Sequence, residues 1–161
     1  MRGIYLLTLV LLSWQSALAR LGETSQEMEK RYGPAITSGS LPGFTQCTYQ
    51  KQSFEITAFY KDGVSVLEKF ARRGLDQETA RQVVVLVAAT AIGCPDAAQE
   101  AVIRQASGIT LKDEIFWAWT NGGQAVNAAF NPIECTVSFF GDPAVYASVQ
   151  AALASMPLPG G

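Results

Sequence analysis

Residues 54–71 read FEITAFYKDGVSVLEKFA, and this stretch decides the fold class. Apolar side chains occupy every second position of residues 54–60, namely Phe54, Ile56, Ala58 and Tyr60. Asp62-Gly63 supplies the positive-φ residues of a tight turn, and residues 64–71 continue as a second strand. We therefore predict an antiparallel hairpin with one buried face and one mixed face.

Further strand patterns lie on both sides of this hairpin. We predict one more strand before it, at residues 44–49, and a second meander at 114–120, 124–130 and 133–140. In the last strand, alternation predicts four core-facing side chains: Ile133, Cys135, Val137 and Phe139. The Ser-, Gly- and Pro-rich residues 35–42 are expected to form a loop.

Helix signals separate and flank the two meanders. Thr24 and Glu27 form a capping-box pattern for a short helix that ends at Gly33-Pro34. We expect two helices in the middle of the chain, residues 77–92 after Asp76 and 95–107 after Gly93-Cys94, and a last helix at 143–156 capped by Asp142.

These elements give the order α-βββ-αα-βββ-α. The predicted fold is α+β, with helices packed on one face of antiparallel β-meanders. We expect one compact domain over residues 20–156, whose halves, 20–74 and 75–156, have the element order of a tandem duplication. The order leaves open whether the halves share one sheet or form two, and residues 157–161 are predicted to be a disordered tail.

Residues 1–19 have the parts of a secretory signal peptide. Arg2 is followed by an apolar run at 4–14 and by Ala17-Leu18-Ala19 before Arg20. An uncleaved anchor is the alternative, but the run is shorter than the roughly 20 residues that cross a bilayer. We expect an exported protein, periplasmic or extracellular, without a lipid anchor because position 20 is not cysteine.

Composition excludes several classes of chemistry. The 12 basic and 14 acidic residues give a net charge of −2, which argues against nucleic-acid binding. The chain has no histidine, which excludes Ser-His-Asp and Cys-His catalysis and His-bound zinc. We expect no cofactor, no metal and no catalytic residue, because the carboxylate pairs Asp113-Glu114 and Glu27/Glu29 have the spacing of solvated surface acids.

Three cysteines allow at most one internal disulfide. We favour Cys47 with Cys94, since Cys135 lies in a core-facing pattern that would protect a free thiol. The other two pairings, and a reactive or intermolecular thiol, remain open.

Large aromatic side chains are the candidate partner-binding residues. Trp117 and Trp119 project from one face of a predicted strand, where such residues form either a core, the commoner role, or a binding surface. Phe59 and Tyr49 offer a similar choice on the first meander. Lys69, Arg72 and Arg73 form a basic cluster that we interpret as a charged strand edge or as a contact for an anion or a partner.

The opening helix carries a family resemblance. Gly22-Glu23-Thr24-Ser25-Gln26-Glu27, then Arg31-Tyr32-Gly33-Pro34 and a turn at Asp62-Gly63, resemble exported bacterial proteins of the SmpA/OmlA-like class. That class includes the outer-membrane assembly lipoprotein BamE and shares a fold with β-lactamase inhibitor proteins; uncharacterised secreted bacterial proteins look similar. The resemblance implies a helices-against-sheet module that binds proteins, although this chain lacks the lipid-bearing cysteine and has a second half.

From these patterns we predict a non-catalytic protein-binding module in the cell envelope or outside the cell, whose partner is an envelope or secreted protein. One alternative is a small carboxylate-based hydrolase or an inhibitor of a hydrolase. Another is a structural component of the envelope.

Overall fold

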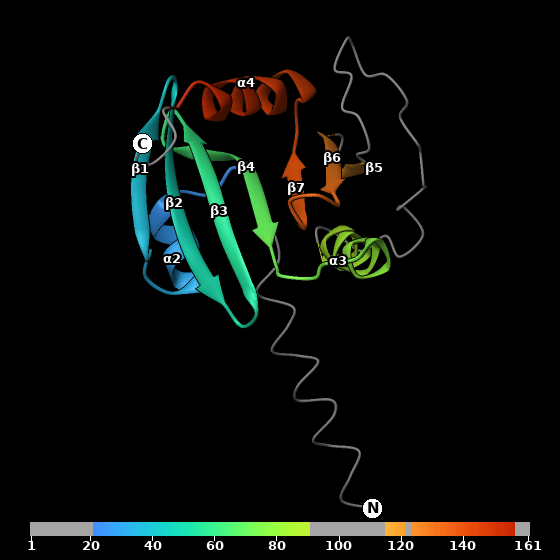
Figure 1. The fold of residues 1–161 in the computed structure, drawn as a ribbon. Coiled ribbons are helices and arrows are strands. Elements are labelled where there is room, and N and C mark those ends of the chain that lie inside the picture. Colours follow the sequence, from blue (N-terminus) through green and yellow to red (C-terminus); the bar gives the residue numbers. More distant parts are fainter. Residues whose placement is uncertain (1–20, 91–114, 122–123, 157–161) are drawn as a thin grey trace, which may run out of the picture.

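The computed structural model describes residues 21–90, 115–121 and 124–156. The predicted signal segment 1–19, helix 95–107 and tail 157–161 lie outside these residues, as do Cys94 and Asp113-Glu114. The described elements, in chain order, are α2 (Ser25–Tyr32), β1 (Thr37–Leu41), β2 (Phe44–Lys51), β3 (Phe54–Lys61), β4 (Val64–Ala71), α3 (Gln77–Thr90), β5 (Ile115–Asn121), β6 (Gln124–Asn131), β7 (Thr136–Phe140) and α4 (Pro143–Ala154) (Figure 1).

All seven described strands belong to one antiparallel sheet in the order β1-β2-β3-β4-β7-β6-β5. Strands β1 to β4 form one meander and β5 to β7 another. The two meanders join where β4 pairs with β7, with Leu67 opposite Phe140 and Phe70 opposite Val137. Strand β4 is therefore the centre of the sheet.

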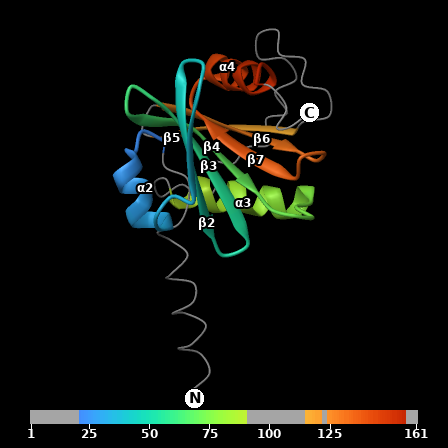
Figure 2. The same cartoon turned by 60° about the vertical axis from the view of Figure 1, so that its left-hand side comes forward.

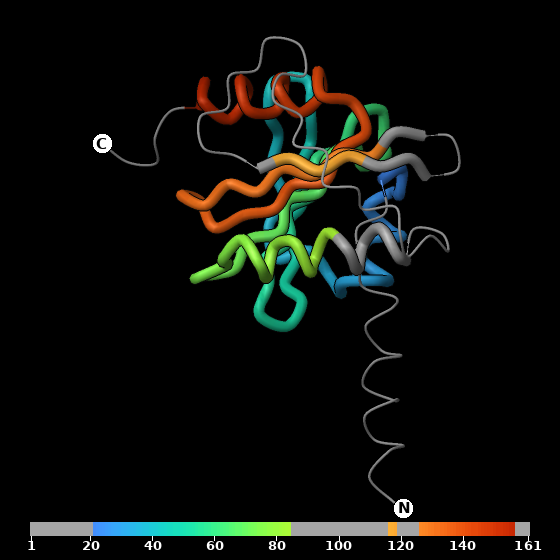
Figure 3. Tube along the Cα trace, turned by 90° about the vertical axis from the view of Figure 1, so that its right-hand side faces the viewer, coloured from blue at the N-terminus to red at the C-terminus, as the bar shows by residue number. Residues whose placement is uncertain are grey.

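Helices cover both faces of this sheet. Helices α2 and α3 lie on one side and α4 lies on the other (Figures 2 and 3). The core under α2 and α3 includes Met28, Tyr49, Ile56, Phe70, Val84 and Phe139. The core under α4 includes Phe59, Leu67, Phe140, Tyr146, Val149 and Ala152.

The predicted fold class was wrong in two respects. The first meander has four strands, because residues predicted as a loop form β1 and pair with β2 around Pro42-Gly43. Side chains of β1 are mostly exposed, so an edge strand there needs no apolar pattern. The helices also do not share one face: Phe59 and Leu67 are apolar on the second face, and α4 covers them.

The last predicted strand was also too long. Strand β7 begins only at Thr136, and Cys135 before it has φ of +54°. The Asn131 side-chain oxygen accepts hydrogen bonds from the backbone N–H groups of Ile133 and Glu134, both at 3.0 Å. This local turn competes with strand pairing, and it leaves Ile133 82% exposed instead of in the core.

The local signals that the sequence carries most strongly were correct. The Thr24 side chain accepts the backbone N–H of Glu27, and Glu27 accepts the N–H of Thr24, so the predicted capping box is confirmed. Asp142 caps α4 through the N–H of Ala144 at 2.8 Å. Asp62 and Gly63 have φ of 54° and 83°, the left-handed values that the tight turn requires.

Candidate functional site

Part of the α4 side of the sheet carries polar side chains in register. Helix α4 packs on the apolar row that contains Phe59, Leu67 and Phe140. The next row pairs Thr48 with Thr57 and Thr57 with Lys69 across three strands, and all three side chains are half-buried. The two threonine hydroxyls are 3.3 Å apart and share a hydrogen bond.

The row beyond contains Gln50 opposite Glu55, and both side chains are exposed. Alternation places Glu55 on the same face as Thr57 and Phe59. We call the polar surface of β2, β3 and β4 the open face. It consists of Thr48, Gln50, Glu55, Thr57 and Lys69.

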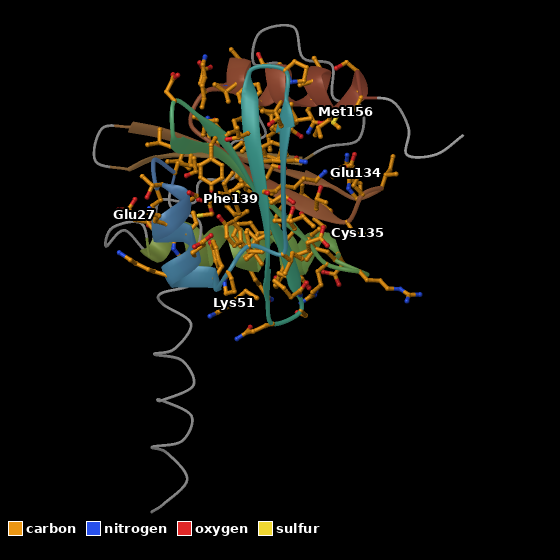
Figure 4. The ribbon with its side chains drawn as sticks, turned by 90° about the vertical axis from the view of Figure 1, so that its left-hand side faces the viewer. Glu27, Lys51, Glu134, Cys135, Phe139 and Met156 are labelled. Atoms are coloured by element: carbon orange, nitrogen blue, oxygen red, sulfur yellow. The ribbon has the colours of Figure 1, made fainter. Side chains whose placement is uncertain are left out.

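A hollow of about 440 Å³ lies at the strand ends where Gln50 and Glu55 of the open face meet residues that pack toward the opposite side, such as Cys135. Four separate segments line it: the end of β2 and its turn, the start of β3, the end of β4 with the residues after it, and the β6–β7 turn. The lining residues are Gln50, Ser53, Glu55, Ala71, Arg72, Arg73, Gly74, Glu134 and Cys135. Figure 4 shows Glu134 and Cys135 together on one side of the molecule, away from Glu27. We call this feature the charged hollow.

One ion pair holds the β6–β7 turn against β4. The Lys69 ammonium and the Glu134 carboxylate are 2.5 Å apart, although the two residues are far apart in the sequence. The backbone N–H of Arg72 donates to the carbonyl of Cys135 at 3.2 Å. These two contacts fix the wall of the hollow that carries the thiol.

The two arginines of the hollow have different surroundings. The Arg72 guanidinium lies over the Phe54 ring, 5.2 Å from its centroid, and its side chain is half-buried. Arg73 is exposed. Among the described residues, neither arginine forms an ion pair, and neither does Glu55. The lining itself carries two arginines and two glutamates. Because Lys69, which lies outside the lining, neutralises Glu134, Arg72 and Arg73 remain against Glu55.

The carboxylates of the hollow differ from a catalytic pair. Glycoside hydrolysis by two carboxylates needs one of them kept protonated, usually by an apolar environment. Glu55 is exposed, and the Glu134 side chain is 46% exposed and bonded to Lys69. Of the pair Glu27/Glu29, Glu27 caps α2: the Thr24 N–H donates to its carboxylate and holds the pKa of Glu27 below its usual value.

A second group of polar side chains lies in the core beneath α2. Glu68 is fully buried, and Tyr32 donates a hydrogen bond to its carboxylate at 3.2 Å. The hydroxyls of Tyr49 and Tyr60 are 2.8 Å apart. Burial raises the pKa of Tyr49 to about 12, and it also raises the pKa of Tyr32 and Tyr60. This group stabilises the packing of α2 and is closed to a partner.

An ion pair lies at the edge of the same core. Arg31 and Glu23 are bonded to each other, with side chains 7% and 20% exposed. Arg31 also donates to the Tyr32 hydroxyl at 3.3 Å and lies over the Tyr32 ring. The pair connects the residues before α2 to its last turn.

Three of the four aromatic residues predicted for partner binding are inside the protein. Trp117 and Phe59 are 3% and 2% exposed, in the two different cores, and Tyr49 is fully buried. None of these three side chains is available to a partner at the surface. Trp119 lies on β5, at an edge of the sheet, but its side chain is outside the described residues.

The cysteines and the basic cluster have the following positions. Cys47 and Cys135 are half-buried and form no disulfide within the part of the chain that the structure describes; the predicted partner Cys94 lies outside it. The interpretation of Lys69, Arg72 and Arg73 as a strand edge was wrong, because β4 is the central strand. No pattern in the sequence indicated Glu55 or Glu134 as neighbours of this cluster. Only the pairing of β4 with β3 and β7 brings them there.

Comparison with known proteins gives little that bears on function. No family model matches the chain, and no curated protein matches it. Among solved structures, a cysteine-rich secretory protein from Staphylococcus aureus aligns with a TM-score of 0.42 and 9% identity. The alignment covers 81% of this chain and 47% of that one, so the chain spans about half the length of that protein.

Membrane spans and metal clusters are both missing from the described residues. Within residues 21–90, 115–121 and 124–156, no helix is long and apolar enough to cross a membrane. The same residues contain no group of three or more acidic or cysteine side chains placed to hold a metal ion.

Proposed function

We propose that this protein is a non-catalytic binding module, exported to the periplasm or the cell exterior, that binds another envelope or secreted protein through its open face. The observation that carries the proposal is the uneven cover of the sheet. Helices α2 and α3 pack on one face, whereas α4 covers only the apolar row of the other and leaves polar side chains of β2, β3 and β4 in contact with solvent.

The composition of the open face suits a protein partner. Threonine and glutamine side chains donate and accept hydrogen bonds, and they lie on a backbone that pairing with neighbouring strands holds in place. A rigid surface loses little conformational freedom when it binds. The charged hollow at the end of the face adds a position where charge can select the partner.

The resemblance of the opening helix to BamE-like proteins agrees with a binding role and remains a prediction. The structure supports this proposal better than the three alternatives, which are a hydrolase, a hydrolase inhibitor and a structural component. For the hydrolase, the two acids of the hollow lack the buried environment that acid–base chemistry needs. A structural component would not bind one partner at a single surface.

Site-specific photo-crosslinking in the cells that produce the protein tests the proposal. A photoreactive phenylalanine at Thr57 reports contacts at the open face. The same group at Gln82, which is exposed on α3, is the matched control. We expect one crosslinked protein from Thr57 that is absent from Gln82.

A blocking variant completes the test. Thr48→Arg places a bulky charge beside Thr57 and should abolish the crosslink, while circular dichroism confirms that the variant is folded. The same species from both crosslinking positions, or none from Thr57, would contradict a binding role for the open face.

A further inference from the structure

We propose that the charged hollow is a carboxylate-binding subsite, which receives an acidic group of the partner that lies on the open face. The partner therefore carries a carboxylate at the edge of its contact surface. This inference rests on the proposed function for the identity of the ligand, but the chemistry of the subsite can be measured without any partner.

The charges of the lining favour an anion. Lys69 and Glu134 neutralise each other at 2.5 Å. The remaining charged groups of the lining are Arg72, Arg73 and Glu55, so the hollow carries one net positive charge when Lys69, which lies outside its lining, is counted with Glu134. The chain as a whole has a net charge of −2, so the hollow is positive against a negative background.

The geometry favours a carboxylate over a bulky anion. Guanidinium groups bind carboxylates through two parallel hydrogen bonds, and a guanidinium held in one orientation loses less freedom on binding. The Phe54 ring holds Arg72 in this way, at 5.2 Å from the ring centroid. Phe54 packs against the core under α2 and α3, so Arg72 enters the hollow from the side of β3 opposite Glu55. Arg73 follows it directly, and the bond from the Arg72 N–H to the Cys135 carbonyl fixes the backbone there. A volume of about 440 Å³ accommodates one acidic side chain or a chain terminus.

Polar groups around the two arginines limit what else can enter. Gln50 and Ser53 lie on the β2 side of the hollow, and Glu55 lies at the start of β3. The Glu55 carboxylate opposes ligands with several negative charges, and it favours one carboxylate accompanied by hydrogen-bond donors. A peptide chain has this pattern, because its backbone N–H groups lie near a side-chain or terminal carboxylate.

The thiol of Cys135 lines the same hollow and provides a local reporter. An anionic disulfide reagent, dithiobis(nitrobenzoate), carries a carboxylate on each ring, whereas dithiodipyridine is neutral. The ratio of their reaction rates at Cys135 measures attraction of a carboxylate into the hollow. The ratio cancels changes in the exposure and ionisation of the thiol, and mass spectrometry of peptides separates Cys135 from the other cysteines.

We expect Arg72→Gln/Arg73→Gln to lower this rate ratio by about three- to tenfold at low salt, from the loss of two charges at a distance of several ångströms in a wet site. Lys61→Gln/Arg81→Gln removes two positive charges elsewhere and should leave the ratio unchanged. Added sodium chloride should reduce the preference of the wild-type protein for the anionic reagent. An equal ratio in both double variants would overturn the inference.

Competition identifies the source of the carboxylate. Acetyl-aspartate amide offers a side-chain carboxylate, and acetyl-alanine offers a terminal one. Protection of Cys135 by either compound supports the subsite, provided that the same compound with its carboxylate converted to an amide gives no protection. If the thiol reacts with neither reagent, the side-chain Nε–H resonances of Arg72 and Arg73 are followed during titration with acetate against chloride. Equal shifts with the two salts refute the subsite. A refuted subsite leaves the Thr57 crosslink intact, so the two proposals fail separately.

Discussion

Removing a single hydroxyl from the core beneath α2 should cost more stability than its size suggests. Tyr32→Phe keeps the ring, which packs against the rings of Tyr49 and Phe70 at centroid distances of 5.8 and 6.3 Å. It removes the hydroxyl that donates to the fully buried Glu68 carboxylate at 3.2 Å and accepts a bond from Arg31 at 3.3 Å. A hydrogen bond to a charged group contributes about 1.5–3 kcal/mol, and we expect Tyr32→Phe to lower the free energy of unfolding by that amount.

Tyr49→Phe is the matched comparison. It also removes one hydroxyl from a buried ring, but the bond that it breaks joins two neutral hydroxyls, those of Tyr49 and Tyr60. The expected loss is about 0.5–1.5 kcal/mol. The difference between the two variants therefore reports the bonds of the Tyr32 hydroxyl to its charged partners, Glu68 and Arg31.

Urea denaturation followed by tryptophan fluorescence, to which the buried Trp117 contributes, measures both losses. A double-mutant cycle with Glu68→Gln, which keeps the shape and removes the charge, gives the coupling directly. We expect Tyr32→Phe to cost about 1 kcal/mol less in the Glu68→Gln background, because the hydroxyl then donates to a neutral amide. Equal costs for Tyr32→Phe and Tyr49→Phe, with no coupling to residue 68, would refute the reasoning.

Three other predictions follow from the same structure. Burial raises the pKa of Tyr49 from 10.0 to about 12. The stability that the neutral Tyr49 hydroxyl contributes should therefore be complete below pH 10 and lost as the pH rises through about 12. Urea midpoints and phenolate absorbance, measured between these two pH values, check the expected loss. Tyr146→Ala removes a ring stacked at 4.5 Å on Phe140 and should cost about 3–5 kcal/mol, whereas Ile133→Lys, at an exposed position, should change stability by less than about 0.5 kcal/mol in the same denaturation assay. Gly63→Ala forces a side chain into a backbone with φ of +83° and should lower the thermal midpoint by the equivalent of about 1–2 kcal/mol, and an unchanged midpoint would show that the turn relaxes.

The sequence predicted what depends on neighbouring residues. The capping box of Thr24, the cap at Asp142 and the turn at Asp62-Gly63 are each decided within a few residues, and all three are present. Strand β1 was missed because its polar, glycine-containing sequence pairs only at an edge, where no apolar pattern is required. Alternation through Ile133 failed because the Asn131 side chain ends the pairing locally.

The charged hollow depends on contacts between distant segments. Lys69 meets Glu134 only because β4 pairs with β7. The sequence held one indication that a helix packs on the second face of the sheet: Phe59 and Leu67 are apolar and lie on the same face as Thr57. This pattern does not show which helix packs there. Propensity and periodicity therefore predicted most helices and strands, but not which of them lie next to each other in the fold.

The pairing of β4 with β7 also constrains how the chain can fold. Leu67 and Phe140 are neighbours in the central strands, yet almost half of the chain separates them in sequence. Sheets that depend on such distant pairings fold slowly. A long loop must close, at a cost in entropy, before contacts between the paired strands can stabilise the sheet. The first meander alone would leave β4 as an unpaired edge. During synthesis from the N-terminus, the central sheet therefore cannot be completed until β7 has been made, late in the chain.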